Sequence, residues 1–167
     1  MKRSVLMVTL IAVMLTVPDS AVSVPGRFAR HQVKVFFSDA DATDCSKTLR
    51  FTRWTSGRDV LDDALNWLSR GPRKGERADG ASSWFSKKTA GMIDDVRIED
   101  GTANVDLDDV RKIMSGASAS CGSASLLANL NKTVLQFPAV DRVVYSLEGS
   151  ADAFYSWLQM DSPPGNG

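Results

Sequence analysis

The strongest hydrophobic pattern in this chain lies between Ser56 and Pro72 and predicts an amphipathic helix. Its apolar residues recur every three or four positions, and its polar residues fall on the opposite face. Ser56 and Asp59 have the spacing of a capping box, in which each side chain bonds a backbone N–H at the start of the helix. Gly71 can take the left-handed conformation that ends a helix, and Pro72 cannot continue it. The predicted apolar face consists of Val60, Leu61, Ala64, Leu65 and Leu68, with Trp67 at its border.

Shorter segments on both sides of this helix alternate between apolar and polar residues, as half-buried strands do. The first of them has Val33, Val35 and Phe37 on one face. Asp100-Gly101 separates two such segments and predicts a tight hairpin, because both central residues of a type I′ turn need a positive φ. The predicted strands cover residues 32–38, 48–55, 96–99, 102–107 and 140–147.

Two further helices are predicted in the second half of the chain. Small residues from 115 to 125 lead into the longer helix, whose apolar side chains recur at helical spacing until Pro138 ends it. Ser150 is placed to cap the shorter one. The apolar positions are Leu126, Leu127, Leu130, Val134 and Phe137 in the longer helix, and Phe154, Trp157 and Leu158 in the shorter one.

This order of elements predicts an α+β fold with a small mixed or antiparallel sheet of about five strands. Two main helices would pack on one face of that sheet, and a short helix would follow at the C-terminal end. We expect one domain over residues 32–160. The tail at residues 161–167 is rich in proline and glycine, and we expect it to be disordered.

The first 23 residues have the features of a cleavable signal peptide. Lys2 and Arg3 precede an apolar run at residues 5–17, and the small residues at 21–23 favour cleavage after Ser23. The apolar run is shorter than the roughly 20 residues that a membrane-spanning helix needs. We therefore expect a secreted, extracytoplasmic protein that begins with a linker at residues 24–31 and has no membrane span in the mature chain. An uncleaved membrane anchor is the alternative.

The charge of the chain argues against nucleic acid as a partner. It has 20 Lys and Arg residues and 20 Asp and Glu residues, so its formal net charge is zero, and both signs are interspersed. A nucleic-acid-binding domain usually carries a basic excess. We therefore expect no nucleic acid among the partners.

The chain has two cysteines, Cys45 and Cys121, and both lie in the part predicted to be exported. A disulfide between them is favoured in an oxidising compartment. It would tie the loop after the first strand to the start of the longer second-half helix. Two alternatives stay open: buried free thiols, and a reactive thiol at Cys121, where the N-terminus of a helix lowers a thiol pKa.

Side chains suited to catalysis are few. His31 is the only histidine, and the sequence places no partner beside it for a Ser-His or Cys-His nucleophile. No two acids have a spacing that selects them for glycoside hydrolysis. The sequence therefore predicts a protein that is not an enzyme, with no catalytic residues and no cofactor. A hydrolase is the third function that we consider.

Asp39, Asp41 and Asp44 come closest to a metal-binding pattern. Calcium takes several oxygen ligands, which alternating aspartates in a loop can supply. The spacing lacks the glycine and the final glutamate of a known calcium loop, and a solvated turn explains the same residues. These aspartates support the alternative function, a secreted protein that binds a small ligand or a cation.

Residues 73–91 form a long connection rich in Gly, Ser and Lys. Connections of this length in a compact domain are often functional or mobile. Its aromatic residues, Trp84 and Phe85, would anchor a partner if they were exposed. If they were buried, they would fasten the connection to the sheet or to a helix. The predicted partner-binding residues are Glu76, Gly80, Ser83, Trp84 and Phe85.

Three blocks of the sequence resemble the GerMN domain family, the sporulation and spore germination domain of bacterial envelope proteins. The most specific block runs from Ala64 to Pro72 and continues to Glu76, Gly80 and Ser83. It is similar to the family pattern Leu-Leu-x-Gly-Pro-Thr-x-x-Glu-x-x-x-Gly-x-x-Ser. Residues 100–107 and 133–140 resemble two further blocks. The chain departs from the pattern at Arg73, where the family has Thr, and at residues 86–87, where it often has Pro.

The resemblance implies an extracytoplasmic module for binding or assembly, related in fold to ring-building domains of the spore envelope. It supplies no catalytic residues. Together with the features above, it leads us to expect a secreted, non-enzymatic GerMN-like module of the bacterial cell envelope. Its partner would be an envelope protein or a cell-wall component.

Overall fold

The computed structural model describes residues 30–163. The predicted signal peptide, most of the linker and residues 164–167 of the tail lie outside the described residues. His31, expected at the end of the linker, is the first residue of a strand. The elements are β1 (His31–Asp39), β2 (Thr48–Thr55), α1 (Val60–Ser69), α2 (Lys74–Ala78), β3 (Ala81–Ser82), β4 (Ile93–Glu99), β5 (Thr102–Leu107), α3 (Ser120–Val134), β6 (Arg142–Leu147) and α4 (Ala151–Trp157).

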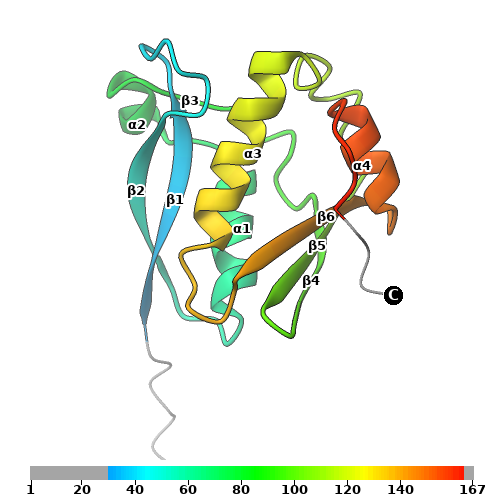
Figure 1. Cartoon of the computed structure of the whole chain (residues 1–167). Helices are drawn as coiled ribbons and strands as arrows, with labels where there is room; N and C mark the ends of the chain where they lie inside the picture. The colour runs from blue at the N-terminus through cyan, green and yellow to red at the C-terminus, as the bar shows by residue number, and fades with distance from the viewer. Residues whose placement is uncertain (1–29, 164–167) are drawn as a thin grey trace, which may run out of the picture.

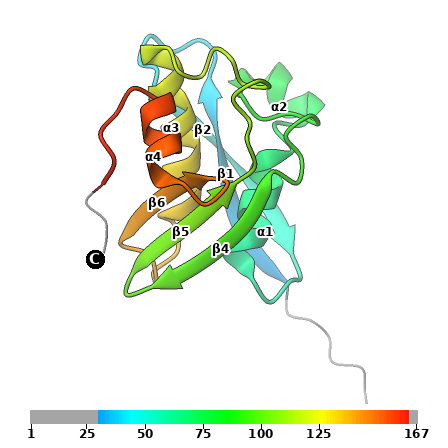
Figure 2. The same cartoon turned by 90° about the vertical axis from the view of Figure 1, so that its right-hand side faces the viewer.

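The predicted α+β class is confirmed, but the described strands form two small sheets where one was expected. The first sheet has the order β2-β1-β3 and is antiparallel. The second has the order β4-β5-β6, with β4 antiparallel and β6 parallel to β5. In Figure 1 the long helices α1 and α3 lie side by side between the two sheets. Figure 2 shows β4, β5 and β6 side by side.

Side chains from the end of α3 and from the turn after it occupy the edge of β1 that a further strand would need. β3 pairs only with Ser38 and Asp39 at the end of β1. Further back, Lys34 N donates to Gln136 Oε1 and Gln136 Nε2 donates to Lys34 O, both at 2.7 Å. Phe36 N donates to Thr133 Oγ1 at 3.3 Å. These bonds satisfy backbone groups that a strand would otherwise pair, so the two sheets do not join into one.

The helix α1 has the predicted apolar face and the predicted end, but its start differs. Gly71 has a φ of 74°, as a left-handed helix stop requires. The expected capping box is wrong, because Asp59 is the N-cap residue and no side chain caps the helix. Instead, Thr55 Oγ1 donates a hydrogen bond to the Asp63 carboxylate, which joins the first turn of α1 to the end of β2. The buried residues of α1 are Leu61, Ala64, Leu65, Leu68 and Ser69.

The hairpin and the caps in the second half of the chain agree with the sequence pattern. Asp100 and Gly101 have φ values of 46° and 74°, which confirms the predicted tight turn between β4 and β5. Ser150 Oγ accepts a hydrogen bond from Ala153 N at 3.2 Å and caps α4. The helix α3 begins at Ser120, inside the stretch of small residues that was expected only to lead into it.

Small residues at the start of α3 allow close packing. A Cβ on Gly122 would lie 2.5 Å from Gly116 O, so only glycine fits there. The buried Ser123 places its Oγ 3.2 Å from both Ala117 O and Leu158 O, to one of which it can donate. These tertiary contacts override the weak helix propensity of the segment and extend the helix toward its N-terminus.

The predicted disulfide is present between Cys45 and Cys121, with a Cα–Cα distance of 5.4 Å. Neither cysteine is free, so the two thiol alternatives are wrong. The bond ties the loop after β1 to the first turn of α3, as expected. Because it closes a loop over 76 residues, the chain-entropy account gives it about 4.5 kcal/mol of stabilisation.

One hydrophobic core joins the inner faces of both sheets to the helices. Phe37 from β1, Tyr145 from β6 and Phe154 from α4 are among its largest buried side chains. The rings of Tyr145 and Phe154 are 5.2 Å apart, within the range of favourable aromatic pairs. Within residues 30–163, no helix has the length and apolar character needed to cross a membrane.

Candidate functional site

The long connection of residues 73–91 has an outer half and an inner half. The outer half, residues 73–79, contains the short helix α2. The inner half, residues 80–91, contains the two-residue strand β3. Neither element was predicted. Gly80, with a φ of 89°, allows the turn between the halves. In Figures 1 and 2 α2 lies at the opposite edge of the molecule from α4.

The inner half carries three of the predicted partner-binding residues into the fold. Phe85 is 1% exposed and belongs to the core. Trp84 is half-buried, and its Nε1 donates to Ser125 Oγ on α3 at 2.9 Å. Ser83 Oγ lies 3.3 Å from Asn129 Oδ1, also on α3, and accepts from Phe85 N at 3.1 Å. For Phe85 the second of our two explanations therefore applies: its side chain fastens the connection.

The inner half is also fixed to the end of α1. A Cβ on Gly71 would lie 2.3 Å from the carbonyl oxygen of Phe85, so any other residue would clash there. Thr89 Oγ1 is buried and lies 2.7 Å from Ser69 O, one of the carbonyls left open at the end of the helix. Gly71 thus combines a positive φ with a close backbone contact, which accounts for its place in the sequence motif.

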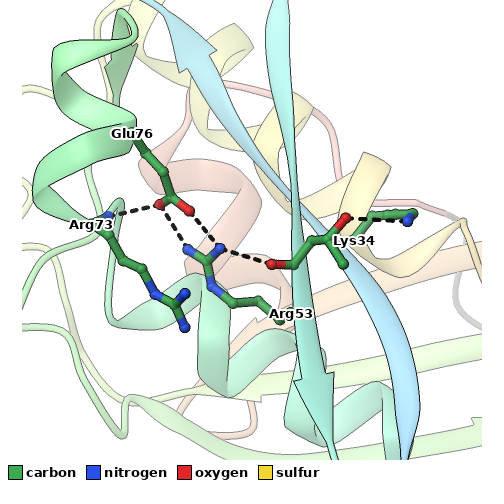
Figure 3. A network of polar contacts seen from close by, with 5 residues as sticks. Lys34, Arg53, Arg73 and Glu76 are labelled. Carbon is green, nitrogen blue, oxygen red and sulfur yellow. Dashed lines mark hydrogen bonds and ion pairs between the residues drawn. The ribbon is translucent and has the colours of Figure 1, made fainter.

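The outer half is held by one buried ion pair, between Glu76 on α2 and Arg53 on β2 (Figure 3). Arg53 Nη1 donates to Glu76 Oε1 at 2.5 Å and Arg53 Nη2 donates to Oε2 at 2.7 Å, a two-pronged pairing. Arg73 N donates to Glu76 Oε2 at 2.7 Å, which satisfies a backbone donor at the start of α2. The exposed fractions of the two side chains are 2% for Arg53 and 12% for Glu76.

The environment of Glu76 favours its charged form. Burial by itself would raise the pKa of this carboxyl, but hydrogen bonds from Arg53 and from the Arg73 backbone, together with the two positive charges, bring the pKa below its usual value. Arg53 occupies an inward-facing position on β2, where its Nε is buried without a hydrogen-bond partner among the described residues. A buried charge destabilises a fold unless a partner neutralises it, so the burial of Arg53 requires the Glu76 carboxylate.

Three arginine side chains surround the half-buried ring of Trp67. The guanidinium carbons of Arg70, Arg73 and Arg53 lie 4.9, 5.4 and 5.9 Å from the ring centroid. Such distances allow cation–π attraction. The ring therefore links the buried ion pair to the exposed arginines at the end of α1 and the start of α2.

A pocket of about 650 Å³ lies beside Trp67, between the end of α1 and the long connection. Trp67, Gly71, Pro72 and Ala90 give it apolar surface. The rest of the wall is cationic. We call it the Trp67 pocket, and its lining consists of Arg53, Trp67, Arg70, Gly71, Pro72, Arg73, Lys74, Arg77, Lys87 and Ala90.

Most of the cations in the Trp67 pocket have no acidic partner. In the part of the chain that the structure describes, the only ion pair at this pocket is that of Arg53 with Glu76. The other five cationic side chains are those of exposed residues. They are Arg70, Arg73, Lys74, Arg77 and Lys87. The pocket can thus offer several unpaired positive charges to a ligand.

A larger hollow, of about 1020 Å³, lies over the outer face of the second sheet. It is rich in carboxylates, but some of them already have partners: Asp106 Oδ1 accepts from Ser146 Oγ and from Gly149 N. The acids that line it are Asp94, Asp95, Glu99, Asp106 and Asp141. Arg97 and Arg142 also line this hollow, and Arg97 pairs with Asp95 at 2.9 Å. The hollow thus has an excess of acids, whereas the lining of the Trp67 pocket is cationic.

The aspartates considered for a cation are engaged locally. Asp39 Oδ2 pairs with Lys47 Nζ at 3.1 Å, and its Oδ1 accepts from Asp41 N. Asp44 Oδ1 accepts from the Ser46 backbone and hydroxyl. Between residues 30 and 163, no three His, Cys, Asp or Glu side chains are placed to hold a metal ion. Asp39 and Asp44 thus use their oxygens for local contacts in this structure, and a cation site at Asp39, Asp41 and Asp44 stays a prediction. The other residue considered for chemistry, His31, is exposed at the start of β1.

Glu76 was predicted from the sequence, whereas the pocket beside it was not. Arg70, Arg73, Lys74 and Arg77 form a dense basic segment on both sides of the Gly71-Pro72 helix stop, and this was a signal that we did not use. Nothing in the sequence indicates that Arg53 and Lys87 line the pocket, because β2 and the end of the connection reach it only in the folded chain.

Comparisons with known proteins agree with the fold. A profile of the Germane family, described as "Sporulation and spore germination", matches residues 34–152. A search of curated proteins gives no match. The structure of the tandem GerMN domains of the sporulation protein GerM from Bacillus subtilis is similar over 77% of this chain, with a TM-score of 0.54 and 22% identity. This chain covers 43% of that structure, less than half of its length.

The structure of the first GerMN domain of the same Bacillus subtilis protein is similar over 72% of this chain and 84% of its own, with a TM-score of 0.54 and 17% identity. At these identities the two structures show a shared fold alone. The family profile covers most of the chain and confirms the resemblance found in the sequence blocks. This chain belongs to the Germane family of sporulation and spore germination domains.

Proposed function

We propose that this protein is a secreted, non-enzymatic module of the cell envelope that binds an envelope protein or a cell-wall component. Its contact region is the exposed side of the outer half of the connection, around Glu76, together with the end of α1. The observation that carries the proposal is the placement of α2: its cations are exposed, while one buried ion pair fixes the helix to β2. A fixed exposed surface loses little conformational entropy on binding.

Two further features support the extracytoplasmic location. Disulfides such as Cys45–Cys121 persist in oxidising compartments and are rare in the cytosol. The first 23 residues have the pattern of an export signal. Mass spectrometry of the protein recovered from the culture medium or envelope fraction tests both features. We expect a chain that begins at or near Val24 and has no free thiol.

The binding role is tested by co-sedimentation of the purified protein with the envelope fraction of the cells that produce it. We expect the protein to sediment with the envelope material. A reversal of charge at two exposed positions of α2, Lys74→Glu and Arg77→Glu, should release it. Arg50→Glu and Arg58→Glu change the same charge at exposed positions outside the Trp67 pocket and serve as the control. Equal loss in both variants, or no sedimentation of the unmodified protein, would show that this contact region is wrong.

A further inference from the structure

We propose that the Trp67 pocket binds an anionic polymer of the cell envelope, and that Arg70 and Arg73 hold its phosphate or carboxylate groups. This inference rests on the proposed function and names the chemistry of the ligand. It is carried by three features of the pocket: arginines without an ion-pair partner placed over an aromatic ring, further cations on two sides, and a buried arginine that is neutralised separately.

The arginines beside Trp67 are arranged before any ligand arrives. Their guanidinium carbons lie 4.9 Å and 5.4 Å from the ring centroid for Arg70 and Arg73. A guanidinium placed over an aromatic ring can keep N–H donors available to another group. Those donors match the two oxygens of a carboxylate or phosphate. Because Trp67 limits the movement of these arginines, binding costs less side-chain entropy than it would with free arginines.

Arg53 forms part of the inner wall of the pocket, and its charge is not available to a ligand. Its charge is matched by Glu76 through two hydrogen bonds, at 2.5 and 2.7 Å. An anion in the pocket therefore meets the exposed cations first. The buried pair holds α2 against β2 beside Trp67. This fixes the positions of Arg70 and Arg73 relative to each other.

The number and spread of the cations favour a polymer over a single ion. Lys74 and Arg77 come from α2, whereas Lys87 comes from the other end of the connection. A single small anion reaches the donors of one or two side chains, but a polymer with repeated charges can contact all of them. The carboxylates over the second sheet, on another part of the surface, would repel the same polymer and orient it toward the pocket.

The inference is tested by calorimetric titration of the purified protein with three polymers: polyphosphate, polygalacturonate and uncharged dextran. The first two distinguish a phosphate from a carboxylate as the group that is bound. We expect one or both to bind, with an affinity that falls as salt is added because exposed charges are screened. Dextran should not bind. Binding of neither polyanion would overturn the inference.

Matched variants locate the binding. Arg70→Ala with Arg73→Ala should weaken the affinity by about tenfold or more, because both sets of charged hydrogen bonds to the anion are lost. Arg70→Lys with Arg73→Lys keeps the charge but not the fork, and we expect a smaller loss. Arg50→Ala with Arg58→Ala removes two exposed charges elsewhere and should change the affinity by no more than about twofold. Melting temperatures confirm that each variant is folded.

The outcomes separate this inference from the proposed function. If the envelope fraction retains the protein and neither excess polyanion releases it, the module binds, but its ligand is not an anionic polymer. If the pocket and control variants lose affinity equally, the binding is general electrostatic attraction and the pocket is wrong. Self-association that is lost in the pocket variant, without any polyanion binding, would show instead that the cations meet the acidic face of a second copy.

Discussion

The two halves of the connection at residues 73–91 have opposite roles in the molecule. The inner half places Phe85 in the core and Trp84 against α3. The outer half keeps its cations exposed. Among the ion pairs of residues 30–163, only Arg53–Glu76 fixes this half to the sheet. A long connection is therefore not free for binding along its whole length. Its aromatic residues stabilise the fold, and its charged residues remain available.

This difference leads to a general expectation. Substitutions in the inner half should change the free energy of unfolding, because they remove buried contacts. Exposed substitutions in the outer half should change binding and leave stability within about 0.5 kcal/mol. Glu76 is the exception, because it lies in the outer half but holds a buried charge.

Phe85→Ala should lower the free energy of unfolding by about 4 kcal/mol, because it leaves a cavity in the core where a 1% exposed ring was packed. Urea denaturation followed by circular dichroism measures the change. Lys88→Ala, at an exposed position of the same inner half, is the control and should be neutral. A loss below about 1 kcal/mol for Phe85→Ala would mean that the inner half is not part of the core.

Glu76→Gln should lower the free energy of unfolding by about 3 kcal/mol, since it leaves the buried Arg53 charge without its partner. The same denaturation experiment measures it. The double variant Arg53→Met with Glu76→Gln removes both charges and should recover part of the loss. If the double variant is less stable than Glu76→Gln, the packing of Arg53 matters more than its charge.

Trp84→Phe should cost about 1 kcal/mol, because it removes the N–H that bonds Ser125 Oγ at 2.9 Å and keeps an aromatic ring in place. The control is Trp54→Phe, since Trp54 is 57% exposed on the outer face of β2. Equal unfolding free energies for the two variants would indicate that the bond to α3 contributes nothing.

The smallest effect is a pH dependence of the Glu76 contribution. The pKa of Glu76 in the folded protein lies below its ordinary value of 4.5, so its stabilisation is complete above that pH and is lost as the pH falls through the lower folded value. The difference in unfolding free energy between the unmodified protein and Glu76→Gln should therefore shrink below about pH 4.5. Other acids titrate in both proteins and cancel in the difference. A constant difference down to acid denaturation would exclude a charge effect.

Much of the fold follows from local patterns. The helical spacing from Val60 to Leu68, the Gly71-Pro72 stop and the Asp100-Gly101 turn involve residues close in the chain, so periodicity and turn chemistry predict them. The single pair of cysteines likewise predicts the disulfide. The helix start at Ser120 was missed because small residues carry no hydrophobic period, although their tight packing on Gly116 and Ala117 holds the helix there.

The candidate site was only partly predictable for the same reason. Glu76 lies in a recognisable motif, and basic residues are concentrated from Arg70 to Arg77. Whether Trp84 and Phe85 would be exposed could not be read from the sequence, because an aromatic pair outside a periodic element fits a core or a contact surface equally well. Their burial depends on contacts with α3, which follows much later in the chain, and with the end of α1, which precedes the connection.

The residue patterns alone were enough to predict the longer helices and strands, the disulfide and the family, because each depends on local spacing, on the cysteine count or on short motifs. They did not predict α2 or β3. That the strands form two sheets was visible only in the folded chain, because side chains from the end of α3 and the turn after it occupy the edge of β1. The tertiary structure also decided which cations meet at Trp67. A pocket made by β2, α1, α2 and residues near 87 exists only when long-range packing brings four separate segments together.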